Sequence, residues 1–160
     1  MALRRSSRLI GYGHIGVMSC FIFWASEAME RIVRSRLKLA SVMFVFLWFF
    51  IGGIAHFAAT ETEMRIVAPW IPWPRPAVLV SGVFELLDAA GLLLLSTRQA
   101  AGIGLFLLTI AVTPCHIYML QRPELLPIPV WALWLRLPIQ VALLALIAWC
   151  TAPDRRFPQR

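Results

Sequence analysis

The stretch APWIPWPRPAVLVSGVFELLDAAGLLLL, residues 68–95, joins a turn rich in proline and tryptophan to a long apolar run. The run at 77–95 has the length of a membrane-spanning helix, because a hydrocarbon core of roughly 30 Å takes about 20 helical residues to cross. It nevertheless contains Glu85 and Asp88. Since a charge at the centre of a span costs roughly 2.5–3.5 kcal/mol on insertion scales, acids in a span point to a functional site.

The composition of the whole chain is typical of a membrane protein. Of its 160 residues, 60% are hydrophobic and 14% are charged, and the mean hydropathy is +0.76. We predict an all-α, four-helix transmembrane bundle, made of two consecutive helical hairpins, within a membrane domain at 37–151. The four predicted spans are 39–59, 77–95, 100–120 and 131–150.

The charged residues predict how the spans are oriented. Basic residues precede the first span, lie in the 96–99 turn and follow the fourth span in the tail at 152–160. By the positive-inside rule, we expect both termini and the 96–99 turn in the cytoplasm, and the 68–76 turn outside. The net charge of +7 does not indicate a nucleic-acid partner, because the basic residues flank the spans and form no recognition motif.

The N-terminal extension, residues 1–36, has two interpretations. Its apolar stretch at 9–26 has arginines before and after it, and glycines and a histidine interrupt it, so we expect an interfacial helix rather than a fifth span. Alternatively, synthesis begins at Met29, which would leave a short basic leader before the first span. The three isolated cysteines form no CxxC motif and do not indicate a thiol relay.

The two predicted hairpins resemble each other. The sequence IPWP at 71–74 aligns with LPIP at 126–129. The alignment also matches polar residues of the two halves: Glu85 with Gln140, Ser81 with Arg136, and, with a small difference in loop length, His56 with His116. A repeat of this kind predicts two hairpins related by an axis along the membrane normal, with the repeated polar groups near that axis.

Polar residues three or four positions apart share one face of each predicted span. With a rise of about 1.5 Å per residue, most of them fall in one layer of the outer leaflet, and Asp88 lies near the midplane. We expect Arg136 to pair with Glu85, and the hydroxyl groups to satisfy the remaining hydrogen bonds. The candidate ligand-binding cluster is His56, Ser81, Glu85, Asp88, His116, Arg136 and Gln140.

Several functions are compatible with such a layer. A pocket for a quinone-like lipophile fits best, because His and Arg can donate hydrogen bonds to carbonyls and Glu85 can exchange protons. Polar residues that only fix helix packing, as in a ligand-free scaffold, and a small-solute or proton-linked transporter are the alternatives. We expect no metal, because His56, His116 and Glu85 have no tight ligand spacing and Arg136 would repel a cation.

The order of these motifs resembles the DoxX family of bacterial four-helix membrane proteins. The resemblance covers about 37–151 and rests on GGIAHF, MRIVAPWIPWPRPAVLVSGVFELL, TRQAAGIGLFLLTIAVTPCHIYM and LWLRLPIQVALLALIAW. The sequence departs from the family pattern at Asp88-Ala89-Ala90 and at His116. The resemblance implies a multi-pass protein of the bacterial cytoplasmic membrane that associates with an oxidoreductase subunit. It defines no catalytic residues and no oligomeric state.

Tryptophans flank the outer ends of two predicted spans. Trp70 and Trp73 precede the second span, and Trp131 and Trp134 begin the fourth. Because amphipathic rings favour the membrane–water interface, we predict that these four residues are interface anchors in contact with the lipid bilayer.

Overall fold

The computed structural model describes residues 11–125 and 127–153, with side chains from Trp24 onward. The chain divides into two units, 1–38 and 39–160, and the helical bundle lies in the second. The predictions for the first ten residues, for Leu126 and for the end of the basic tail, and the Cys20 side chain, lie outside the described part.

The described residues are helical and contain no strand, so the predicted all-α class is confirmed. Four helices are long and apolar enough to cross a membrane, which suggests a multi-pass membrane protein. The elements are α1 (Gly11–Ala58), α2 (Thr60–Met64), α3 (Pro74–Leu93), α4 (Arg98–Gln121), the 3₁₀ turn η1 (Pro123–Leu125) and α5 (Val130–Thr151).

The observed helices differ from the predicted spans at their ends. The candidate span in α1 is Trp24–Ala58, so it begins well before the predicted start at 39. Helix α3 begins at Pro74 rather than at 77, because proline is tolerated in the first helical turn, where no backbone N–H partner is needed. The short elements α2 and η1 were not predicted.

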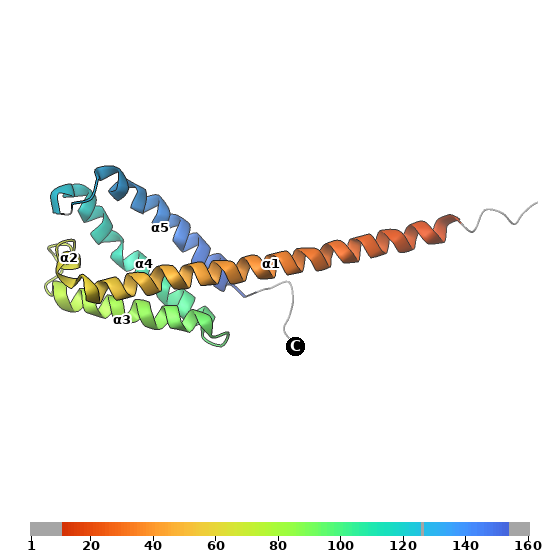
Figure 1. Ribbon diagram of the computed structural model, residues 1–160, viewed down its shortest axis with the longest axis horizontal. Helices are drawn as coiled ribbons and strands as arrows, with labels where there is room; N and C mark the ends of the chain where they lie inside the picture. Colours follow the sequence, from red (N-terminus) through yellow and green to blue (C-terminus); the bar gives the residue numbers. More distant parts are fainter. Residues whose placement is uncertain (1–10, 126, 154–160) are drawn as a thin grey trace, which may run out of the picture. The chain divides into compact units, whose positions relative to one another are not determined.

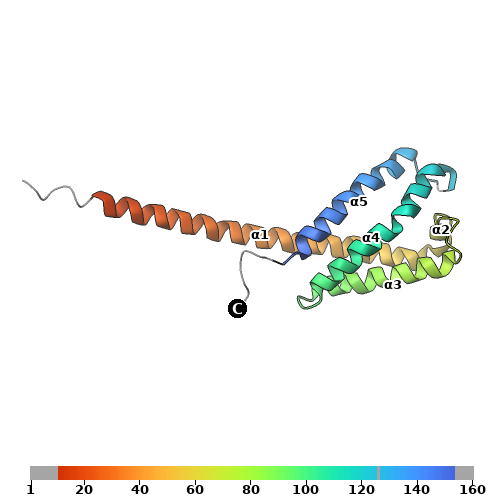
Figure 2. The same ribbon diagram turned by 180° about the vertical axis from the view of Figure 1, so that it is seen from behind.

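The two loops that contain α2 and η1 lie at the same end of the bundle, and the α3–α4 turn lies at the opposite end (Figures 1 and 2). Two side chains of that turn donate hydrogen bonds to carbonyls in the last turn of α3. Thr97 Oγ1 donates to the Gly91 carbonyl at 2.8 Å, and Arg98 Nε donates to the Leu92 carbonyl at 2.9 Å. Carbonyls left without partners at the helix end are thereby satisfied.

The interior of the bundle has an apolar cluster at each end. The cluster near the α3–α4 turn includes Val45, Leu92, Leu105 and Ile147, each fully buried. The smaller cluster near the other loops consists of Ile66, Met119 and Leu133, with Leu120 and Ile128 packed against it. Outside these clusters, large apolar side chains are exposed on every long helix, as expected for surfaces that face lipid.

Helices α1 and α3 approach closely through two glycines. A Cβ atom added at Gly53 would lie 2.8 Å from the Leu86 side chain and 3.3 Å from the Gly82 carbonyl oxygen. A Cβ atom added at Gly82 would lie 2.8 Å from His56 Cβ. Small residues at a helix contact let the backbones approach, and here they bring His56 beside α3.

Candidate functional site

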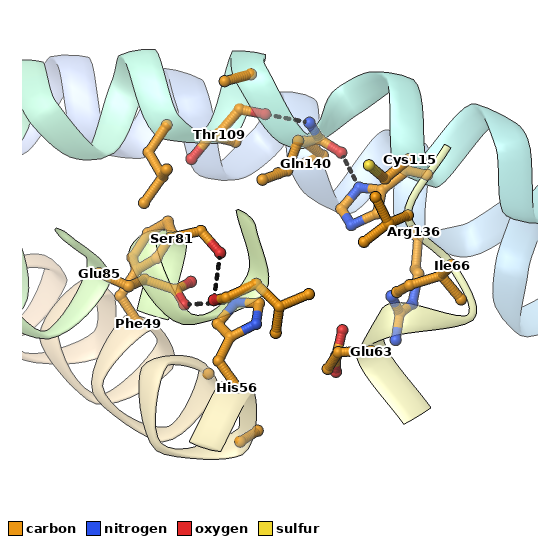
Figure 3. Close-up of a pocket in the computed structure, with 18 of the residues that line it drawn as sticks. Phe49, His56, Glu63, Ile66, Ser81, Glu85, Thr109, Cys115, Arg136 and Gln140 are labelled. Atoms are coloured by element: carbon orange, nitrogen blue, oxygen red, sulfur yellow. Dashed lines mark hydrogen bonds and ion pairs between the residues drawn. The ribbon is translucent and has the colours of Figure 1, made fainter. Parts of the chain in front are cut away.

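A cavity of about 790 Å³ lies between the two apolar clusters. All four long helices contribute to its lining, together with α2 and the loop after it. The lining is mainly apolar, and its polar side chains are few (Figure 3). They are His56, Glu63, Ser81, Glu85, Thr109, His116, Arg136 and Gln140. Ligand pockets typically combine such a volume with an apolar wall and a few placed polar groups.

The first polar pair of the cavity is His56 of α1 with Glu85 of α3. His56 Nε2 lies 3.1 Å from Glu85 Oε2, and both side chains are largely buried. Gly52 leaves room for the carboxylate, because a Cβ there would lie 3.2 Å from Glu85 Oε1. Among the described residues, neither His56 Nδ1 nor Glu85 Oε2 has a partner in hydrogen-bonding geometry. The pair therefore has hydrogen-bonding capacity that no described residue uses, at two atoms that are themselves buried.

The second polar pair is His116 of α4 with Gln140 of α5. Gln140 Nε2 donates to the Thr109 carbonyl at 2.7 Å and to Thr113 Oγ1 at 2.6 Å, so its Oε1 faces His116 Nδ1. Because an amide oxygen can only accept, Nδ1 of His116 carries the hydrogen. A neutral His116 ring then has Nε2 as an acceptor.

The two pairs follow the repeat in the sequence. His56 and Glu85 of the first hairpin align with His116 and Gln140 of the second, and the structure pairs them within each hairpin. The pairs differ in chemistry. His56–Glu85 can gain or lose protons at both partners, whereas Gln140 cannot ionise and uses both ends of its amide in hydrogen bonds. The first pair is therefore the better suited of the two to proton exchange.

The expected ion pair between Arg136 and Glu85 is absent from the described residues. Glu85 contacts His56 instead, and Arg136 Nη1 lies 4.0 Å from the sulfur of Met119. The reason is the helix arrangement. The close contact at the glycines places α1 directly beside α3, so His56, rather than Arg136, lies within contact distance of Glu85. Arg136 still lines the cavity and is partly open to its surroundings.

The other predicted site residues separate into two groups. Ser81 lines the cavity, and its hydroxyl donates to the Val78 carbonyl at 2.8 Å, which leaves its lone pairs available as acceptors. Asp88 does not line the cavity. Its carboxylate lies against Gly104 of α4, deeper in the bundle, where a Cβ would have no room. Asp88 is therefore separate from the cluster to which the sequence assigned it.

The four tryptophans lie outside the cavity. Each is more than half exposed, at 66% for Trp70, 72% for Trp73, 68% for Trp131 and 63% for Trp134. Trp70 also packs edge-on against Tyr118, with ring centroids 6.3 Å apart. Their role as interface anchors stays a prediction, and these exposed rings do not contribute to the lining.

Sequence reasoning missed the contribution of the first loop to the cavity. Glu63 of α2, together with Ile66, Val67 and Ile71 after it, lines the cavity from the loop end. The run TETEM at 60–64 has the composition of a short helix with acids in its first turn, a signal that favours helix formation. In the described part of the chain, no three His, Cys, Asp or Glu side chains gather as metal ligands.

The chain resembles a known protein family. A family model described as a domain of unknown function, DUF8561, matches residues 43–152, which include every polar residue of the cavity. Neither the curated proteins nor the solved structures contain a match.

Proposed function

The chain belongs to the DUF8561 family, and on this premise we propose that it is a small redox-associated membrane subunit that binds a quinone-like lipophile. The observation that carries the proposal is the cavity of about 790 Å³ with its partly unsatisfied His56–Glu85 pair. An apolar tail fits the lining, and a ring carbonyl can accept a hydrogen bond from His56. Glu85 provides a site for the proton that quinone chemistry consumes or releases.

The wider setting belongs to the same proposal. We place the protein in the bacterial cytoplasmic membrane as a DoxX-type subunit, with the cavity in the outer leaflet and an oxidoreductase as its partner. The support for this setting is the order of the sequence motifs and the distribution of basic residues. A ligand-bearing subunit of this kind would hold the lipophile within reach of the partner's redox centre.

The test is binding of decylubiquinone to the purified protein in phosphatidylcholine nanodiscs, together with mass spectrometry of lipophiles and proteins that co-purify in mild detergent. His56→Phe keeps a ring of similar size and removes both nitrogens, so binding should weaken by up to about tenfold, since one hydrogen bond contributes roughly 0.5–1.5 kcal/mol. Phe84→Leu, a change at an exposed α3 side chain, is the matched control.

The outcomes separate the proposal from its alternatives. Binding by the wild type and the control, with weaker binding by His56→Phe, supports a quinone-like ligand. No binding by any of them, with a protein that co-purifies in constant ratio, would instead indicate a ligand-free scaffold. Substrate flux into proteoliposomes without retained lipophile would indicate a transporter.

A further inference from the structure

The cavity has a second polar region around Arg136 of α5. Figure 3 shows Arg136 on one side of the cavity and the His56–Glu85 pair on the other. The Arg136 side chain lines the cavity and is also exposed, so it lies where the cavity opens. It lies six residues after Val130, the first residue of α5, and thus about 9 Å along the helix from the loop end.

The positive charge of Arg136 has no acidic partner among the described residues. Its polar contact is the 4.0 Å approach to Met119, and a thioether sulfur is only a weak acceptor. Glu85 contacts His56, and Asp88 lies against Gly104 away from the cavity. Glu63 also lines the cavity, but it forms no ion pair with Arg136 within 4.0 Å.

A guanidinium without an anion is costly in this setting. Arginines within membrane spans pair with other groups or reach the interface, because an isolated charge in hydrocarbon is strongly disfavoured. The planar guanidinium also matches a carboxylate or phosphate with two parallel hydrogen bonds. An apolar cavity that ends at such a group has the form of a binding site for an amphiphile with an anionic head.

We infer that Arg136 forms an anion subsite at the opening of the cavity, which binds the carboxylate or phosphate head of an amphiphile whose apolar tail enters the cavity. The inference rests on the proposed function only in that the cavity holds a lipophile. It names a head-group chemistry and a residue that the quinone proposal does not require. The anion can come from a free amphiphile or from a lipid of the surrounding bilayer.

The experiment compares the binding of amphiphiles that share one alkyl tail but differ in their head groups. Native mass spectrometry of protein released from phosphatidylcholine nanodiscs counts bound palmitate, hexadecanol and decylubiquinone directly, without the background of molecules dissolved in the bilayer. Palmitate should bind at least about tenfold more tightly than hexadecanol, because charge-assisted hydrogen bonds are roughly twice as strong as neutral ones. Arg136→Gln should abolish this preference, and Arg136→Lys should retain part of it.

Two further variants control for indirect effects. Arg122→Gln removes an arginine that lies outside the spans and pairs with Glu124 at 3.2 Å, so the palmitate preference should persist. Glu63→Gln removes an acid from the cavity lining and should strengthen palmitate binding. A preference that survives in Arg136→Gln, or that weakens in Glu63→Gln, would overturn the inference.

The experiment also identifies the source of the anion, and it distinguishes failure of the anion subsite from failure of the proposed function. If phosphatidylglycerol in the discs displaces palmitate, the head belongs to a bilayer lipid; if palmitate binds equally in both discs, it belongs to a free amphiphile. Either result supports the subsite. If decylubiquinone binds but palmitate is not preferred over hexadecanol, the anion subsite alone is overturned. If none of the three compounds binds, the proposed function is overturned as well.

Discussion

Gln140 shows how one buried residue organises the second hairpin. It is 6% exposed and uses its amide to join Thr109 and Thr113 to His116. These bonds connect α4 to α5 beside the cavity. A buried polar group that has all its partners fixes the helix rotation, whereas one that loses a partner leaves a desolvated atom behind.

Replacing Gln140 with methionine, which has a similar volume, should lower the free energy of unfolding by about 1–2 kcal/mol. The expected loss is modest because a hydrogen bond between membrane helices contributes on average less to stability than one within a water-soluble protein. Thermal unfolding in detergent measures the change. Val141→Met, at a neighbouring side chain that is 67% exposed, should leave the midpoint nearly unchanged. Equal midpoints for the Gln140 variant and the wild type would show that this network does not stabilise the bundle.

The residue scale also shows what the sequence could and could not predict. Helical spacing placed His56, Glu85, His116 and Gln140 in one layer, and the structure places all four in the cavity lining. Their partners did not follow from spacing, because a pairing depends on which helices are adjacent and how each is rotated. Asp88 shares the face of Glu85 by spacing but lies one turn deeper, against α4.

At the scale of the helices, the contact between α1 and α3 determines the geometry of the first pair. Gly53 and Gly82 allow the close approach, and Gly52 leaves space for the Glu85 carboxylate. Glycines of this kind are visible in the sequence, but helix order is needed to know which of them face each other. The start of α3 at Pro74 lies three residues before the predicted start of the span at 77, although proline is favoured in the first turn of a helix.

Gly82→Val should separate α1 from α3 and destabilise the bundle by about 1–3 kcal/mol, the usual cost of overpacking. The added side chain would meet His56 Cβ and the Phe57 ring, neither of which can move far without shifting α1. Ala90→Val on the exposed face of α3 is the matched control and should unfold as the wild type does. An unchanged midpoint for Gly82→Val would mean that the two helices do not pack through this position.

At the scale of the whole molecule, the four spans were predictable because length and hydropathy determine them, and lipid imposes helices on any segment that crosses it. The cavity was not predictable in the same way. It exists because the two apolar clusters fill the ends of the bundle, while residues from all four long helices leave the layer between them unfilled. Its loop-end lining comes from α2 and the residues after it, which belong to no span.

The central claim is that this cavity holds a lipophile, and filling it with protein tests the claim most directly. Val112→Phe adds a ring at a lining position, whereas Val141→Phe adds the same ring at an exposed position outside the cavity. Native mass spectrometry of both variants and the wild type measures the retained lipophile. We predict that Val112→Phe loses the bound mass while the other two keep it; equal retention by all three would contradict a ligand site in this cavity.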